Sequence, residues 1–106
     1  MEIPKKIKIG GRNYNVLFPY NFMERGDIKG QHDGDMEVLR IDSRDIYSHE
    51  LRPMSSVVVT LIHEVLHAID YVTGHRVFSE NEKACEGFSE CLYQILVDNG
   101  WLELEQ

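Results

Sequence analysis

The sequence predicts an α+β fold in which about three strands pack on two long helices. Apolar residues alternate on both sides of Gly10 and Gly11, which is typical of two strands joined by a tight turn. In two later segments apolar residues recur every three or four positions, as in amphipathic helices. With 106 residues the chain is expected to form one domain, spanning residues 1–106.

The N-terminal half is expected to hold the three strands. The first two form the hairpin, with apolar positions at Ile3, Ile7, Ile9, Tyr14, Val16 and Phe18. Residues 19–36 carry three glycines and several acids without apolar periodicity, so they are expected to form a long irregular connection. Residues 37–41 are rich in aliphatic side chains and predict the third strand.

Two long helices are expected in the C-terminal half. The first runs from about residue 54 to 72, after Pro53, which suits a first helical turn because it lacks an N–H, and it stops at Gly74. Its apolar stripe contains Val58, Leu61, Ile62, Val65, Ile69 and Val72. The second runs from a capping box at 79–82 to about residue 99. Its stripe contains Ala84, Cys85, Phe88, Cys91, Leu92, Ile95 and Leu96, and both stripes are expected to face the core.

Charge and composition exclude several classes of partner. The net charge is -7 and the eleven basic residues are scattered, which argues against a nucleic-acid partner. No run of 18 apolar residues and no apolar N-terminal signal is present, so we expect no membrane partner and a cytoplasmic location. Cys85 and Cys91 lie about 9 Å apart along one helix, too far for a disulfide, and are expected to be small buried residues without a zinc role.

The strongest chemical signal is the pentapeptide 63–67, which begins and ends with histidine. On a helix His63 and His67 share a face, so both imidazoles can bind one metal ion, while Glu64 points about 100° away, towards a metal-bound water. His63, His67 and Asp70 lie nearly opposite the apolar stripe, so the histidines are expected to be ligands rather than core residues. The expected cofactor is one zinc ion, with Glu64 as the general base.

A catalytic zinc site needs a third protein ligand. Position 73 is a threonine, which excludes the metzincin spacing. Of the acids at four-residue steps in the second helix, Glu82 lies closest to the edge of the apolar stripe and Glu90 lies farthest, so Glu82 is the preferred ligand. Glu82 can instead belong to the capping box, and Glu86 is then the ligand. If Glu82 binds the metal, Glu86 can orient a histidine, and Asp70 either supports the ligands or is a surface acid.

The run 63–71, followed by Asn81-Glu82 and an acid at position 86, resembles the zinc site of the gluzincin metallopeptidases, including thermolysin. The layout is similar to that of the minimal gluzincins of phages and prophages, close to the ImmA/IrrE-type metallopeptidases. The resemblance implies a small zincin-like domain with an active-site helix and a glutamate helix. It implies Glu82 as the third ligand and Glu86, in place of the Asp found in thermolysin, as the orienting acid. Asn81 is grouped with the residues that support the ligands.

These observations together predict a hydrolase that cleaves peptide bonds with a zinc-activated water. A peptide or protein substrate is expected, bound along a free edge of the 37–41 strand. Tyr71 and Tyr93 are candidate donors to the developing oxyanion. Three other histidines are expected to lie in loops: His32, His49 and His75. Two alternatives stay open, a non-catalytic zinc site that braces the helices of a regulatory or interaction domain, and a helical interaction module without metal.

Overall fold

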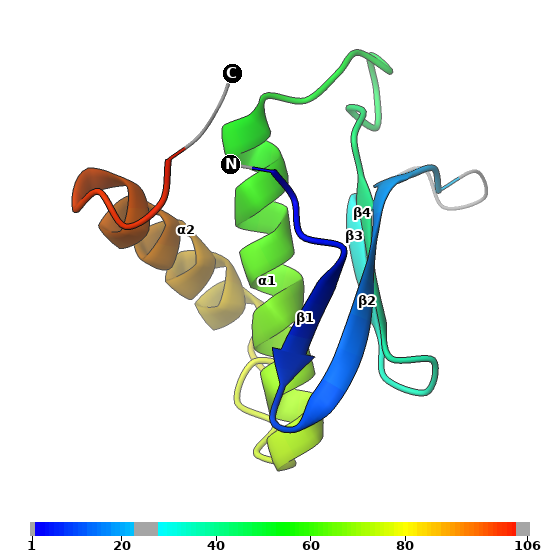
Figure 1. Cartoon of the computed structure of the whole chain (residues 1–106), viewed down its shortest axis with the longest axis vertical. Helices are drawn as coiled ribbons and strands as arrows, with labels where there is room; N and C mark the ends of the chain where they lie inside the picture. Colours follow the sequence, from blue (N-terminus) through cyan, green and yellow to red (C-terminus); the bar gives the residue numbers. More distant parts are fainter. Residues whose placement is uncertain (1, 23–27, 104–106) are drawn as a thin grey trace.

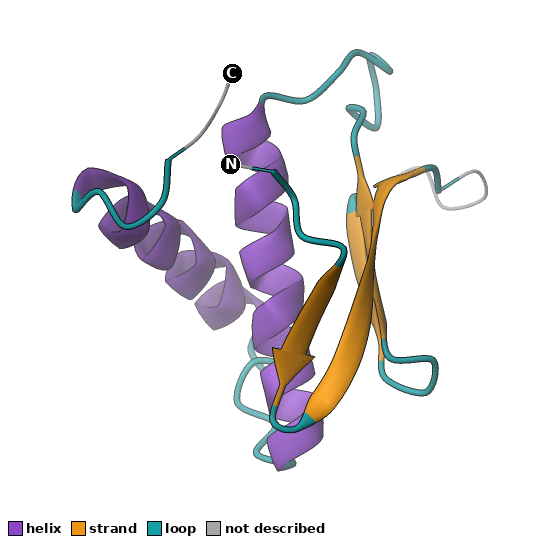
Figure 2. Ribbon diagram, viewed as in Figure 1, coloured by secondary structure: helices purple, strands orange, loops and turns teal. Residues whose placement is uncertain are grey.

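The computed structural model describes residues 2–22 and 28–103, and within them the chain is α+β, as predicted (Figures 1 and 2). The elements in chain order are β1 (Lys6–Ile9), β2 (Arg12–Tyr20), β3 (Gly30–Asp33), β4 (Val38–Asp42), α1 (Met54–Thr73) and α2 (Glu82–Asp98). Figure 1 shows α1 between the sheet and α2, so the helices form two successive layers on one side of the sheet. The sheet has four strands rather than about three.

The strand order is β1-β2-β4-β3, with β4 paired to β2 in parallel and to β3 in antiparallel orientation. The predicted hairpin is confirmed, because β1 and β2 pair up to Ile9 opposite Arg12. Gly10 and Gly11 make the turn with φ values of 56° and 88°, which glycine adopts without steric cost. The strand predicted at 37–41 is β4, and it occupies a central position in the sheet.

Strand β3 corrects the prediction that residues 19–36 form an irregular connection. The sequence of β3 is GQHD, without a single aliphatic residue, so hydrophobic periodicity could not reveal it. Its backbone pairs with β4 from Gly30 opposite Ile41 to Asp33 opposite Val38, and its inner face packs on α1. Residues 23–27 of the predicted connection lie outside the described part of the chain.

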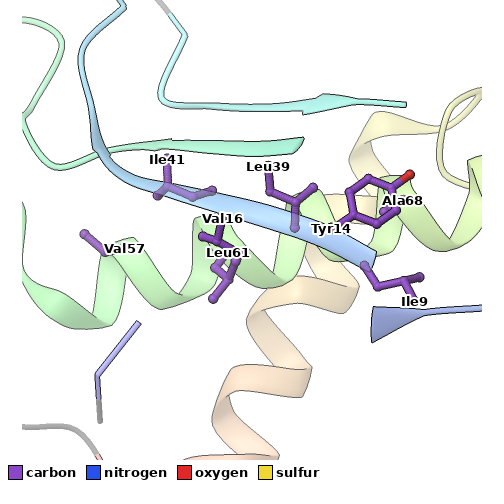
Figure 3. Close-up of a cluster of buried hydrophobic side chains, with 8 residues drawn as sticks. All are labelled: Ile9, Tyr14, Val16, Leu39, Ile41, Val57, Leu61 and Ala68. Atoms are coloured by element: carbon purple, nitrogen blue, oxygen red, sulfur yellow. The ribbon is translucent and has the colours of Figure 1, made fainter. Parts of the chain in front are cut away.

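The core lies between the sheet and α1 (Figure 3). Its buried residues are Ile9, Tyr14, Val16, Leu39, Ile41, Val57, Leu61 and Ala68. The predicted stripe of α1 is rotated from the true buried face, which centres on Val57, Leu61 and Ala68. Ile69, assigned to the core from the sequence, is 40% exposed. Ala68 can occupy the centre of the buried face because the sheet lies close to α1 there. Side-chain hydropathy alone does not reveal such a close approach.

Helix α1 has the length that the sequence predicts and ends at Gly74 in a left-handed conformation, with φ 76°. The N–H of Gly74 donates to the carbonyl oxygen of Asp70, at 2.8 Å. By length and composition alone, with a mean hydropathy of 1.2, α1 could cross a membrane. Core helices of globular domains meet the same criterion, and α1 packs against three of the strands.

Helix α2 begins differently from the prediction of a capping box at 79–82. Its N-cap is Asn81, whose side-chain oxygen accepts from the N–H of Ala84 at 3.0 Å. The capping box does not form because the N–H of Ser79, from which Glu82 would accept, donates to Asp70 instead. The predicted end is confirmed, since α2 extends to Asp98 and Gly100 follows with positive φ.

The apolar stripe of α2 is only partly buried, which corrects its assignment to the core. Cys85 and Ser89 are the buried residues of this helix, and Cys91 is exposed. Both cysteines are free. The exposed fractions of the large apolar residues are 54% for Phe88, 38% for Leu92 and 40% for Ile95. The physical reason is that α2 packs on α1 alone, away from the sheet, along a face turned from the centre of its stripe.

Two substitutions of the same chemistry test this assignment of core and surface. We expect Ile41→Ala to lower the free energy of unfolding by about 2–5 kcal/mol, because Ile41 is fully buried. Ile95→Ala should lower it by less than about 1 kcal/mol, since that side chain already contacts water. Urea denaturation measures both values. Equal losses for the two variants would show that the exposed face of α2 is covered in solution.

Candidate metal centre

Three predicted ligands come together at the point where the start of α2 lies against α1. His63 and His67 lie one turn apart on α1, with ring centroids 4.9 Å apart. The Glu82 carboxylate contacts both rings, through Oε1 to Nε2 of His63 and through Oε2 to Nε2 of His67, the latter at 3.1 Å. The histidine side chains are 17% and 19% exposed and that of Glu82 is 56% exposed. The site therefore has a buried wall and an open side.

Two imidazole nitrogens and a carboxylate oxygen are ligand types that divalent metal ions such as zinc accept. Bonds of about 2.0–2.1 Å in a tetrahedron place neighbouring ligand atoms roughly 3.3 Å apart, close to the separation of His67 and Glu82. The ligand atoms of His63, His67, Glu82 and Cys85 all lie within 4.8 Å of one another. The structure therefore contains a group that could hold a metal ion.

Cys85 is the member of this group that sequence analysis missed. The sequence predicts no zinc role for the cysteines because a site built on thiolates needs several of them, yet a single thiol can complete a set of histidines and a carboxylate. Its buried Sγ donates to the carbonyl oxygen of His63 at 3.6 Å. Burial raises the pKa of the thiol to about 12, and the carboxylates of Glu82 and Glu64 act in the same direction. The spacing of Cys85 three residues after Glu82 is the signal that could have found it.

Glu64 is buried beside the two histidines, with 6% of its surface exposed. Burial raises the pKa of its carboxyl to about 7 and the nearby charge of Glu82 adds to the rise, whereas the backbone N–H of His32 lowers it. A carboxyl group with a pKa near neutrality can both accept and release a proton at neutral pH. Glu64 thus has the environment of a general base.

Strand β3 passes very close to Glu64, and Gly30 makes this approach possible. A Cβ atom at position 30 would lie 2.6 Å from Cγ2 of Thr60 and 2.9 Å from Oε2 of Glu64. Any side chain there would displace the strand or the carboxylate. The glycine therefore allows β3 to cover Glu64 and to exclude water from one side of it.

Asp70 organises the connection between the two helices. Its carboxylate is buried and accepts from the N–H groups of Val77, Phe78 and Ser79, the last at 2.8 Å. Burial tends to raise the pKa of Asp70, but these N–H groups outweigh it and the pKa is lowered overall, with a further contribution from His67. Asp70 is therefore not the surface acid that one prediction made it. The other prediction gave it a supporting role, and its hydrogen bonds support Glu82 through the loop rather than through a direct contact with a ligand.

The remaining predicted supporting residues lie at the rim. Glu86 is exposed and lies outside the group of four ligand atoms. Asn81 acts as the N-cap of α2, directly before Glu82, and so fixes where the helix starts. Among the described residues, Glu82 rather than Glu86 is in position to be the third ligand.

The candidate oxyanion donors differ in position. Tyr71 lines the cleft, but its hydroxyl faces Asp35, with the oxygen atoms 3.5 Å apart. Tyr93 is not among the residues that line the cleft. His32, expected in a loop, lies on β3 and lines the cleft with Glu64.

The cleft has a volume of about 1300 Å³ and lies between β3, α1 and α2. Its wall on the sheet side is formed by Gly30, Gln31 and His32 of β3.

Because β4 is paired on both sides, the expectation of a free edge at 37–41 is wrong. Among the described strands, the end strand of the sheet beside the site is β3, which the sequence did not reveal as a strand. Comparison of the chain with protein-family models, curated proteins and solved structures found no match.

We expect Asp70→Ala to lower the free energy of unfolding by about 2–4 kcal/mol, because the loop N–H groups lose their shared acceptor. It should also weaken metal binding by about 10- to 100-fold, since Glu82 loses its fixed position. Denaturation and a metal titration measure the two effects. Glu50→Ala, at an exposed residue that does not line the cleft, is the control, and a similar result for both variants would contradict the proposed role of the loop.

Proposed function

We propose that this protein is a zinc-dependent metallopeptidase of gluzincin type that hydrolyses peptide bonds. The observation that carries the proposal is the meeting of His63, His67 and Glu82 beside a buried Glu64, at the edge of an open cleft. The arrangement of a sheet, an active-site helix and a glutamate helix is compatible with a small zincin-like domain. The exposed side of Glu82 leaves room for a water or substrate atom, which a catalytic site requires.

His63, His67 and Glu82 would hold the zinc ion, which when bound lowers the pKa of a water to about 7 and polarises the substrate carbonyl. Glu64 would accept the proton of the attacking water and later pass it to the leaving amine. β3 would exclude bulk water from Glu64, so that the carboxylate keeps its raised proton affinity. Asp70 and Asn81 would keep Glu82 in place through the loop and the helix start.

The substrate is proposed to be an extended peptide that binds in the cleft. β3 is the end strand of the described sheet and lines the cleft with Glu64, so a peptide could add to the sheet there through backbone groups other than the His32 N–H, which donates to Glu64. Recognition through the backbone would position a peptide bond without demanding a particular sequence. The strand proposed to bind the peptide is therefore β3 and not the strand at residues 37–41.

Glu64→Gln is the direct test of the proposed chemistry. Its amide cannot accept the proton of the water, so kcat for hydrolysis should fall by about 100- to 10,000-fold. The measurement is zinc-dependent cleavage of a denatured, fluorescently labelled protein by the wild type and the variant. Zinc stoichiometry and the unfolding midpoint should stay near wild type, because Gln has nearly the same shape.

Glu50→Gln is the matched control, since it makes the same chemical change at an exposed residue that does not line the cleft. It should leave hydrolysis unchanged. Wild-type protein that binds zinc but cleaves nothing, or a Glu64→Gln variant as active as the wild type, would overturn the proposed activity.

Zinc binding by alanine variants tests the ligand set. We expect Glu82→Ala to weaken zinc binding by more than about 100-fold, and Glu86→Ala to leave it near the wild-type value, because Glu82 and not Glu86 joins the two histidines in the described site. Competition with a chromophoric chelator measures both affinities. The opposite order would make Glu86 the third ligand.

A second candidate function is a non-catalytic, zinc-stabilised regulatory or interaction domain. Cys85 is the observation that favours it, because a thiolate in the fourth position would close the site to water. Cys85→Ala separates the two functions in the same titration. An open site keeps its zinc affinity without the thiol, whereas a closed structural site loses it.

A further inference from the structure

His32 is a histidine in the cleft that the proposed metal set does not use. It lies on β3 with its side chain on the same face as Gly30, towards α1, and it lines the cleft together with Glu64 and His67. Its ring contacts the rings of Tyr14 and Tyr71, with centroids 5.4 Å and 5.3 Å away. Two aromatic side chains therefore hold the imidazole in one orientation.

The hydrogen bond to Tyr14 determines which ring nitrogen of His32 carries the proton. Tyr14 is fully buried, and burial raises the pKa of its hydroxyl, with Glu37 adding to the rise, so the group keeps its proton. Within the described residues, the only hydrogen-bond partner of the hydroxyl is Nε2 of His32, at 2.8 Å. The proton of a buried hydroxyl needs an acceptor. Nε2 is therefore unprotonated, and the proton of the neutral ring is on Nδ1.

The Nδ1–H group has no hydrogen-bond partner in the described part of the chain. None of the described buried side-chain nitrogen or oxygen atoms lacks a partner, so Nδ1 is accessible to solvent. Since His32 lines the cleft, this N–H is a donor that a bound molecule could reach. Burial also lowers the pKa of His32, with His67 acting in the same direction.

We propose that His32 donates a hydrogen bond from Nδ1–H to the oxygen of the scissile carbonyl, and that Tyr14 is the positioning residue that selects this tautomer. The inference rests on the proposed peptidase function. It identifies a donor different from the tyrosines considered from the sequence. The Tyr71 hydroxyl faces Asp35, so Tyr71 supports the His32 ring instead.

The donor acts on the charge that forms during hydrolysis. Glu64 takes a proton from water as the water oxygen forms a bond to the carbonyl carbon, and the π electron pair moves to the carbonyl oxygen. His32 hydrogen-bonds that oxygen without giving up its proton. When the C–N bond breaks, the oxygen regains its double bond and the leaving amine takes the proton from Glu64. A fixed neutral donor stabilises the charge without reorganisation at the moment of reaction.

The tautomer can be measured on metal-free protein by NMR of ¹⁵N-labelled histidines. We expect His32 to show a protonated Nδ1 and an unprotonated Nε2, and His75, an exposed loop residue, to show the mixture of an unconstrained histidine. Tyr14→Phe removes only the hydroxyl, so it should shift His32 towards the Nε2–H tautomer. A wild-type His32 with the proton on Nε2 would overturn the inference.

Two variants of His32 separate a donor from a structural residue. Gln places its polar group near the position of Nε2, so it can keep the bond to Tyr14 and loses the donor into the cleft. Asn places an N–H near the position of Nδ1 and loses the bond to Tyr14. We therefore expect His32→Gln to be stable with kcat lowered about 100-fold and KM little changed, and His32→Asn to be less stable with the higher kcat of the two.

A structural role predicts the opposite, with activity following stability. His75→Gln is the control and should behave as wild type. If the wild type hydrolyses peptide, Glu64→Gln is inactive and His32→Gln retains full kcat, only the inference about His32 fails. If the wild type shows no zinc-dependent hydrolysis, the proposed function fails and the donor role fails with it.

Discussion

The carboxylate of Asp70 is the interaction on which the arrangement of the site depends. It binds three successive N–H groups of the loop after α1, which turns the chain back on itself and prevents α2 from starting before Asn81. Glu82 is then the first helical residue and lies against His63 and His67. A buried carboxylate is costly unless its acceptor capacity is used, and here several N–H groups use it. One side chain thereby links the ends of both helices to the position of Glu82, the proposed third ligand.

The second constraint is the close contact between β3 and α1. Gly30 lets the strand approach Glu64 to a distance at which no other residue fits. This contact buries the Glu64 carboxylate, which raises its pKa, and it brings the backbone N–H of His32 to the same group. The polar strand therefore contributes to the chemistry of the site through its backbone and through one side chain, rather than through apolar packing. Its pairing with β4 supplies the stability that its own sequence lacks.

The parts of the fold that sequence could predict are those whose own residues carry the signal. The hairpin, α1, the end of α2 and the grouping of His63, His67 and Glu82 follow from turn residues, helical periodicity and ligand spacing. β3 could not be predicted, because a four-residue strand without aliphatic residues is recognised only by its partner. Cys85 and His32 were missed for a related reason, since their roles depend on neighbours distant in sequence. The alternation of Gly30 and His32 on one face of β3 is a sequence signal that could have indicated this strand.

The position of α2 shows that the polar site, rather than apolar burial, sets the packing of this helix. Its buried residues are Cys85 and Ser89, whereas Phe88 and Ile95, nearer the centre of its apolar stripe, remain about half exposed. Rotating α2 to bury the stripe against α1 would move Glu82 away from the histidines. The helix thus forgoes some hydrophobic stabilisation to keep its first residue at the site. If zinc is bound as proposed, the metal joins α2 to α1 directly, and the free energy of binding offsets that loss of burial.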